Sequence, residues 1–159
     1  MEFFEVIKKR HCVREFDAKK SVSDGDIEKI IAVGKKAPSA GGLYPTRFTI
    51  VKKKDFEGLS EAIHQEWFKD ASIVLIVWTD PEETINQYQE RGENLYIIQD
   101  AAAAAENIFL AVTALGLATC WIGTFDDEKL AKFLKLKPGQ WPFVVMPIGY
   151  EKQVKSDKL

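Results

Sequence analysis

Apolar and polar residues recur along the first third of the chain in patterns that predict two helices. Two phenylalanines and an isoleucine, followed by basic residues, predict a short first helix at about residues 2–10. Ser23 and Asp26 have the spacing of a capping box, so a second helix is expected to start near Ser23. It should stop before Pro38, because proline disfavours helical geometry in the residue before it.

The middle of the chain alternates between strands and charged helices. Phe48–Val51 is a short β-rich run, and a charged helix is expected to open at Asp55. Ser72–Trp78 (SIVLIVW) is almost continuously apolar and β-branched, as expected for a strand covered on both faces. The DPEE sequence that follows predicts a helix start with Asp80 as N-cap and Pro81 at the first helical position.

The strongest pattern is a long helix at about Leu95–Leu115, followed by two strands and a helix. One face of this helix is expected to carry Leu95, Ile98, Ala102, Ala105, Phe109 and Val112. A second apolar set wraps it nearly all round, and the run Ala101–Ala105 permits close approach of another helix. The later elements are predicted at Ala118–Ile122, at Asp126–Leu134, where Asp126 is expected to cap the helix, and at Phe143–Tyr150. Because helices and strands do not alternate strictly, an α+β fold is favoured over a doubly wound parallel sheet.

One uncharged stretch, Asn107–Phe125, has the length of a membrane span. It contains asparagine, threonine and glycine, however, and it begins inside the alanine-rich helical pattern. We interpret it as a buried helix that runs into a buried strand, so no membrane association is expected.

Composition bounds the class of protein without naming a function. A chain of 159 residues predicts a single domain, 1–159, with an ordinary hydrophobic share of 46%. The 22 basic and 24 acidic residues give a net charge of −2, which disfavours a nucleic-acid binder held by bulk positive charge. Two cysteines form no disulfide framework, and the N-terminus shows no secretory pattern. A reduced, cytoplasmic setting is therefore expected.

Most constellations of catalytic side chains are absent from the sequence. His11 and His64 are the only histidines, so no metal site is expected. No glycine-rich phosphate loop and no nucleophile elbow occurs. Cys12 beside His11 suggests a thiol nucleophile. That interpretation is the weaker one, because adjacent side chains diverge and no third group orients them.

Three segments carry the remaining chemistry, and each has an ordinary alternative. The basic run Lys8–Arg14 suits a compact anion such as phosphate, or is a solvated helix C-terminus. The small-residue loop Ala37–Pro45 exposes backbone groups to a flat polar heterocycle, or is a plain turn. The segment Gly116–Gly123 places Trp121 either beside a cofactor or in the hydrophobic core.

Taken together, these segments resemble the FMN-dependent nitroreductase family over nearly the whole chain. The matching motifs are RHCVREF at Arg10–Phe16, APSA at Ala37–Ala40, the alanine-rich helix with its GLATCWIG and Phe-Asp continuation at Asp100–Asp127, and FVVMPIGY at Phe143–Tyr150. Each motif is weak alone, whereas their order and spacing are specific.

The resemblance implies an α+β fold with a central, mostly antiparallel sheet flanked by helices, in an intertwined homodimer that binds FMN at its interface. No catalytic side chain is then expected, because flavin N5 accepts the hydride. Two arginines would hold the phosphate, and the loop and the Trp-Ile-Gly segment would border the isoalloxazine from two sides. By position, the FMN-binding residues are Arg10, His11, Cys12, Arg14, Pro38, Ser39, Ala40, Gly41, Gly42, Trp121, Ile122 and Gly123.

The chain departs from the family pattern at several positions. Many members have serine where Cys12 stands, and asparagine and glutamine where Gly42 and Tyr44 stand. The loop Gly41–Pro45 looks more like the branch that contains peptide azoline dehydrogenases. Few residues follow the last strand, so a full swapped arm is not expected; the basic residues there are Lys152, Lys155 and Lys158.

The resemblance implies an oxidoreductase with a ping-pong cycle, in which NAD(P)H reduces FMN and an electron-poor acceptor such as a nitroaromatic or quinone reoxidises it. Residues 64–68 or 88–96 are expected to form a lid. The aromatic residues expected to stack on the acceptor are Trp67, Phe68, Tyr88 and Tyr96. The alternatives are a flavin dehydrogenase of a specific metabolite or peptide heterocycle, a non-catalytic flavin-binding module, and a structural helical dimer without cofactor.

Overall fold

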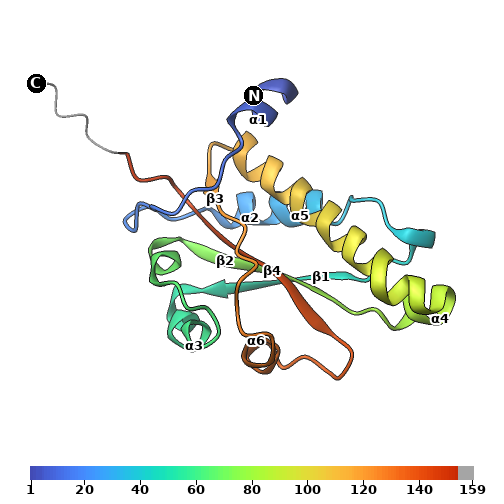
Figure 1. Cartoon of the computed structure of the whole chain (residues 1–159). Helices are drawn as coiled ribbons and strands as arrows, with labels where there is room; N and C mark the ends of the chain where they lie inside the picture. The colour runs from blue at the N-terminus through green and yellow to red at the C-terminus, as the bar shows by residue number, and fades with distance from the viewer. Residues whose placement is uncertain (154–159) are drawn as a thin grey trace, which may run out of the picture.

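The computed structural model describes residues 1–153 and has three layers, with helices on both faces of one sheet (Figure 1). Lys155 and Lys158 lie outside the described residues. The helices are α1 (Phe3–Lys9), α2 (Asp24–Gly34), α3 (Phe56–Ser60), α4 (Glu82–Arg91), α5 (Ile97–Ala114) and α6 (Asp127–Leu134). The strands are β1 (Thr46–Lys52), β2 (Ile73–Thr79), β3 (Ala118–Thr119) and β4 (Trp141–Gly149).

The sheet has the order β1-β2-β4-β3, and its neighbouring strands are antiparallel. The long β2–β4 pairing runs from Ile73 opposite Ile148 to Thr79 opposite Trp141, with an irregularity after Val77. The predicted α+β architecture with an antiparallel sheet is therefore confirmed.

Strand β2 is buried on both faces, as its apolar sequence predicts. Ile73, Leu75 and Val77 face a core shared with α2 and α5. Val74 and Ile76 face a second core beneath α3 and α6. Alternate residues of a strand point to opposite faces, so a strand between two helical layers must be apolar throughout.

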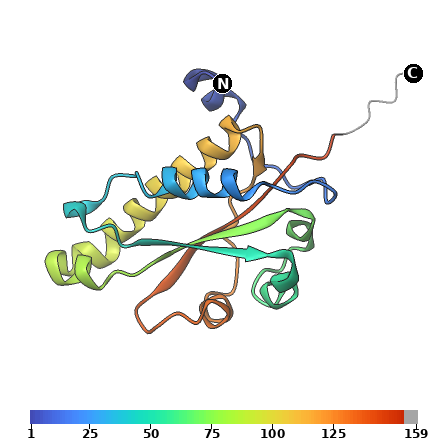
Figure 2. The same ribbon diagram turned by 180° about the vertical axis from the view of Figure 1, so that it is seen from behind.

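Helix α5 crosses the sheet, and α2 lies against it on the same side (Figure 2). The face expected from the sequence is only partly the buried one: Phe109 and Val112 are buried, whereas Ile98 is 39% exposed. Because α5 is apolar nearly all round, its periodicity cannot select which stripe meets the sheet. The buried side chains are those of Ile97, Asp100, Ala101, Ala104, Ala105, Ile108, Phe109 and Val112.

Helix α2 approaches α5 closely at Gly34, which lies against Ile108 and not against the run Ala101–Ala105. A methyl group added at Gly34 would lie 2.8 Å from Ile108 Cδ1 and 3.1 Å from Phe48 Cζ. A side chain at this position would push the two helices apart, so the absence of one sets their separation.

Two of the three predicted helix caps form. The Ser23 and Asp126 side chains accept hydrogen bonds from Asp26 N and Lys129 N. The expected Asp80 cap is wrong, because Pro81 occupies the N-cap position of α4 without a side-chain bond. The Asp80 backbone N–H instead donates to Pro45 O at 2.8 Å.

The helical run from Glu82 to Ala114 is long and apolar enough to pass as a membrane span by length and composition alone. It consists of α4, a π-helical turn at Gly92–Tyr96 and α5. The buried residues of α5 pack on the sheet core, which is the behaviour of a core helix in a globular domain.

Candidate functional site

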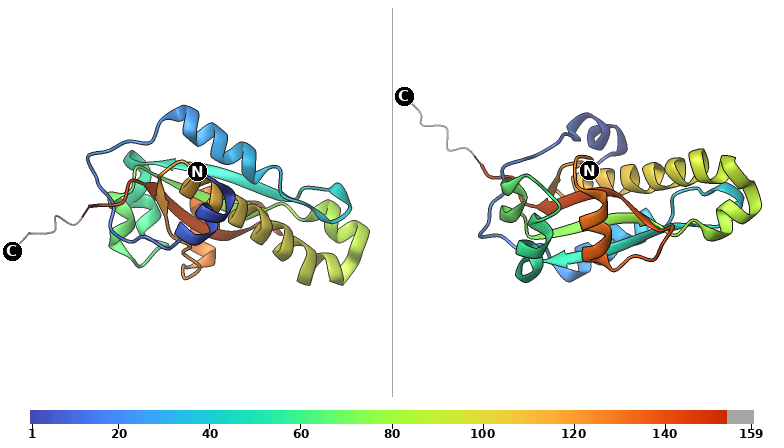
Figure 3. Two further views of the ribbon diagram at one scale, coloured as in Figure 1. Left: turned by 90° about the horizontal axis from the view of Figure 1, so that it is seen from above. Right: turned by 60° about the horizontal axis from the view of Figure 1, so that its bottom comes forward.

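The basic segment after α1 lies at the C-terminal end of α5. Arg10 closes α1, and its guanidinium carbon lies 5.0 Å from the centre of the Phe109 ring. The chain then extends, and the Val13 N–H donates to Thr119 O of β3 at 2.9 Å. This bond places the segment beside the strand that leads into Trp121. Figure 3 shows α1 above the same end of α5.

The positive charges of this segment are largely uncompensated. Within the described residues 1–153, neither Arg10 nor Arg14 has a carboxylate oxygen within 4.0 Å. His11 Nε2 lies 3.5 Å from Glu151 Oε1. The hydrogen bond from His11 Nδ1 to Lys9 O, at 2.8 Å, is the main reason that the pKa of His11 is raised. Such a segment can hold an anion.

The segment after β3 presents different groups to the two sides. Trp121 is exposed and meets Phe143 edge-on, with ring centres 6.0 Å apart. Ile122 is buried in the second core, beneath α3 and α6, and both its N–H and its C=O are bonded to Val145, so it can border a ligand but offers no free backbone group. Gly123 is exposed beside the Trp121 indole. The predicted Trp-Ile-Gly wall thus consists of one ring and backbone.

The small-residue loop is anchored to the first turn of α5 through Asp100. Ser39 Oγ donates to one Asp100 carboxylate oxygen at 2.7 Å, and the Ala40 N–H donates to the other at 3.1 Å. Ser39 Oγ also accepts from the Tyr44 N–H at 2.9 Å. The loop is therefore rigidly positioned by one buried side chain.

Left-handed backbone lets this loop turn sharply. Gly41 and Gly42 have φ of 60° and 68°, and Tyr44 has φ of 51°. A methyl group at Gly41 would lie 2.5 Å from the Tyr88 hydroxyl, whereas one at Gly42 would meet nothing within 4 Å. Gly41 is thus favoured by its conformation, and a side chain there would displace the Tyr88 hydroxyl, whereas Gly42 faces open space.

Two hollows flank the loop. A cavity of about 570 Å³ lies between α2, β1 and α5, with Ser39, Arg47 and Trp78 in its lining. A second cavity, of about 480 Å³, lies between the loop and the helical run α4–α5; we call it the outer hollow, and its lining includes Pro38, Gly41, Tyr88 and Tyr96. Pockets of this size accommodate small molecules.

The four aromatic residues expected to meet an acceptor separate into two pairs. Tyr88 and Tyr96 pack edge-on with centres 5.0 Å apart, and both line the outer hollow beside the loop. Phe68 is fully buried against Phe56, so its assignment to a substrate is wrong. Trp67 is half-buried and stacks on Phe16.

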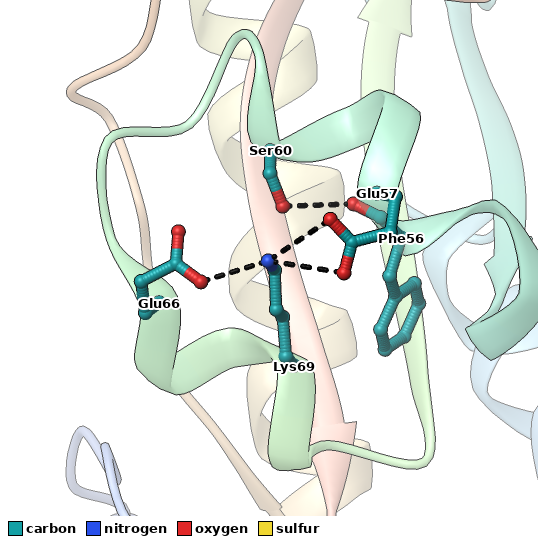
Figure 4. A network of polar contacts seen from close by, with 5 residues as sticks. All are labelled: Phe56, Glu57, Ser60, Glu66 and Lys69. Carbon is teal, nitrogen blue, oxygen red and sulfur yellow. Dashed lines mark hydrogen bonds and ion pairs between the residues drawn. The ribbon is translucent and has the colours of Figure 1, made fainter.

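Residues 64–68 are also held in place, which contradicts their expected role as a lid. Lys69 Nζ lies 2.7 Å from Glu66 and 3.2 Å from Glu57 of α3 (Figure 4). The hydrogen bond to Glu66 is the main reason that the pKa of Lys69 is raised. These glutamates are exposed, so the cluster contributes little stability; the buried Phe68 is the stronger anchor.

The structure brings the basic segment together with residues 118–123, but it places the loop at the other end of α5 (Figure 1). Arg10 contacts Phe109, and Ser39 contacts Asp100, nine residues earlier in the same helix. That separation is about 13.5 Å along the helix axis. The predicted site residues thus form two groups within one chain.

Sequence reasoning missed Asp100, which positions the loop. A signal was present, because Asp100 is the only charged residue between Glu93 and Glu106. A single carboxylate in such an apolar run is buried only with hydrogen-bond donors around it. The partners of those oxygens could be identified only in the folded chain.

Comparisons with known proteins agree on one family. A family model described as "Nitroreductase family" matches residues 7–71 and 54–150. The chain is 31% identical to "Putative NADH dehydrogenase/NAD(P)H nitroreductase" of Archaeoglobus fulgidus, with 98% of this chain and 88% of the relative covered.

Solved structures share the fold over almost the whole chain. A nitroreductase family protein from Clostridium novyi NT is 28% identical, with a TM-score of 0.86 over 96% of this chain and 87% of its own. An FMN-dependent nitroreductase from Clostridium difficile R20291 is 25% identical, with a TM-score of 0.79 over 96% and 89%. The order of motifs, the antiparallel sheet and these matches show that the chain belongs to the nitroreductase family.

Proposed function

We propose that this protein is an FMN-dependent oxidoreductase, which takes hydride from NAD(P)H and reduces an electron-poor acceptor such as a nitroaromatic or quinone. The observation that carries the proposal is the pair of arginines, Arg10 and Arg14, whose charges have no carboxylate partner among residues 1–153. Family membership and relatives named for NAD(P)H and FMN support it.

The chemistry of the basic segment fits the phosphate end of FMN. Guanidinium groups bind phosphate oxygens in a bidentate manner, and Arg10 and Arg14 would supply two of them. His11 and Cys12 lie between them in the sequence and are exposed, so their side chains would reach phosphate or ribityl oxygens. The exposed Lys152 is adjacent, since its backbone N–H donates to Glu15 O at 2.9 Å.

The loop and the Trp121 segment fit the flat, polar ring of the same cofactor. One side of the ring would be bordered by Pro38, Ser39, Ala40, Gly41 and Gly42. These residues would offer backbone groups, because the Ser39 hydroxyl already donates its hydrogen bond to Asp100. Trp121, the Ile122 backbone and Gly123 would border the other. When bound, FMN supplies the hydride-accepting ring, so the protein's contribution is binding, orientation and exclusion of water.

A second copy of the chain would complete this site. Within one chain the loop and the basic segment lie at opposite ends of α5. The short helix α1 exposes Phe3, Phe4 and Ile7 by 62%, 83% and 46%, which is costly for a monomer in water. A homodimer that covers α1 and brings in the partner's loop accounts for both observations. A cytoplasmic location is part of this proposal.

A visible absorption spectrum tests the proposal. The purified chain, supplied with FMN and freed of excess, is expected to be yellow, to bleach with NADH or NADPH without oxygen, and to regain colour when a nitroaromatic or quinone is added. Failure to retain FMN would refute the flavoprotein assignment.

The same experiment separates the alternatives. Retained colour that neither nucleotide bleaches, followed by bleaching with an azoline peptide, would indicate a dehydrogenase instead; the local loop similarity at Gly41–Pro45 is the reason to include that substrate. Retained colour that no donor bleaches would indicate a non-catalytic binding module.

A further inference from the structure

The two cysteines of the chain lie side by side, although they are far apart in the sequence. They are the only cysteines present, and both are free thiols. The hydrogen bond from Val13 N to Thr119 O, at 2.9 Å, aligns the extended segment that contains Cys12 with the one that contains Cys120. Cys12 is close enough to Cys120 to be one of the groups that raise the pKa of the Cys120 thiol. The fold thus creates a vicinal pair of thiols that the sequence does not suggest.

The two thiols differ in their access to solvent, and the pKa of the buried one is raised. Cys12 is exposed, whereas Cys120 is only 1% exposed. Burial, together with the neighbouring Cys12, raises the pKa of Cys120 to about 11, with Arg14 acting in the opposite direction. At neutral pH Cys120 is therefore a protonated, shielded thiol, and only Cys12 meets a reagent from solution.

We propose that Cys12 and Cys120 form a dithiol–disulfide redox site that reacts with small peroxides. The exposed thiol is the peroxidatic group, and the buried thiol resolves it. Neither residue needs to be catalytic for the proposed reduction of acceptors. The disulfide itself requires no bound cofactor; because the proposed function places Cys12 beside the FMN phosphate, the test below is carried out both with and without added FMN.

The chemistry balances with hydrogen peroxide as the oxidant. The Cys12 thiolate attacks one peroxide oxygen, the O–O bond breaks, and hydroxide leaves and takes up the proton that Cys12 released, which gives a sulfenic acid and water. The Cys120 sulfur then attacks the Cys12 sulfur and loses its proton, and the S–O bond breaks to release a second water. Two thiols are oxidised to one disulfide while one peroxide is reduced to two waters.

Closing this disulfide would join two segments of the proposed site. Cys12 stands between Arg10 and Arg14, and Cys120 directly precedes Trp121. The cross-link would fix the position of the basic segment relative to the strand. A disulfide adds stability mainly by restricting the unfolded chain, and the loop between these two residues is long.

The test uses the full-length chain with whatever it binds on isolation, first reduced and then treated with hydrogen peroxide. Free thiols are blocked with N-ethylmaleimide after unfolding, and the intact mass and the digested peptides are measured. The expected result is a monomeric chain that has lost two hydrogens and takes up no N-ethylmaleimide. Its peptides around Cys12 and Cys120 should be joined, and dithiothreitol should restore two free thiols.

Each single variant retains one cysteine and serves as a matched control. In Cys120→Ser, peroxide should leave a sulfenic acid on Cys12 that dimedone traps. In Cys12→Ser, the remaining Cys120 should react at least roughly tenfold more slowly, because it is buried and protonated. Circular dichroism of both variants checks that they fold, and the wild-type result does not depend on them.

Three outcomes would overturn the proposal. One is a wild-type chain whose two thiols both remain alkylated after peroxide treatment. Another is oxidation of Cys12 to the sulfinic acid while Cys120 stays free. The third is a disulfide between two chains, seen on a non-reducing gel, in place of one within a chain.

Discussion

Arg14 is exposed, carries no ion pair within residues 1–153, and directly follows Val13, whose backbone N–H donates to Thr119 O. Its side chain is therefore available to an anion, because no carboxylate competes for it. We predict that Arg14→Ala weakens FMN binding by about 1.5–3 kcal/mol, which is roughly 10- to 150-fold in Kd, the scale of a hydrogen bond to a charged group. Fluorescence titration of FMN measures this change.

The control for this variant is Lys132→Ala, which removes one exposed positive charge from α6. It should leave the FMN affinity unchanged, because α6 lies on the other face of the sheet. Equal affinities of the wild type and Arg14→Ala would remove Arg14 from the phosphate site.

Asp100 accepts hydrogen bonds from Ser39 and Ala40 inside a largely apolar surrounding. Asp100→Ala leaves these donors without an acceptor, and we expect a loss of about 1.5–3 kcal/mol in the free energy of unfolding. Asp100→Asn keeps one acceptor oxygen and should lose less. Urea denaturation followed by circular dichroism checks both values.

Glu106 provides the comparison on the same helix, because it is exposed. Glu106→Ala should change the free energy of unfolding by no more than about 0.5 kcal/mol. Similar losses for Asp100→Ala and Glu106→Ala would mean that the loop is not anchored by the carboxylate.

The buried Cys120 thiol also predicts a pH dependence of stability. Its pKa is raised from 9.0 to about 11 by burial, so the folded chain holds this proton more tightly than the unfolded chain does. Stability linked to this group is fully present below about pH 9 and is lost as the pH rises towards 11. Urea denaturation at pH 8 and pH 10.5 should show a larger fall for the wild type than for Cys120→Ala; equal falls would contradict the assignment.

Among the elements, the join between α4 and α5 depends on the size of one residue. A methyl group at Gly92 would lie 2.5 Å from the backbone oxygen of the buried Thr84, an atom that cannot move aside without distorting the helix. We expect Gly92→Ala to destabilise the protein by about 1–3 kcal/mol. Gly25→Ala in α2 is the matched substitution, because nothing lies within 4 Å of its added methyl group.

Gly25→Ala should raise stability by up to about 1 kcal/mol through helix propensity. Thermal unfolding of both variants measures the difference. If the two alanine substitutions shifted Tm in the same direction, the steric explanation for Gly92 would fail.

At this scale the sequence predicted most elements, and its errors share a cause. Ser23 and Asp126 cap helices as their local spacing predicts. Asp80 does not cap α4, and its carboxylate lies 3.9 Å from Nη2 of Arg47, a residue of β1 that is far from it in sequence. The buried stripe of α5 was misassigned for the same reason. Packing against the sheet and α2 determines which residues of α5 are buried, and the periodicity of α5 itself does not.

At the scale of the whole molecule, helix α1 exposes an apolar surface to solvent. Phe4 is 83% exposed, which makes it the most exposed large apolar residue of the described chain. In the proposed homodimer this ring would be buried, so Phe4→Ser should shift the mass measured by analytical ultracentrifugation from a dimer towards the 18.0 kDa monomer. It should also weaken FMN binding, because the site needs two chains.

Phe4→Ser should hardly affect the unfolding of the monomer, because the ring makes few contacts within it. Lys54→Ala, an exposed substitution beside α3, is the control and should leave the assembly unchanged. A wild-type chain that sediments as a monomer at all concentrations, with FMN bound, would disprove the dimeric site.

Most of the elements, the burial of β2 on both faces and the family could be predicted from the sequence alone, because they follow from local periodicity, capping residues and the order of motifs. The folded chain was needed to show that Asp100 holds the loop, that Phe68 belongs to the core and that the segment of Cys12 is bonded to that of Cys120. It also separated the loop from the basic segment by about 13.5 Å along α5. Each of these depends on contacts between distant parts of the chain, and such contacts leave no periodic signal along it.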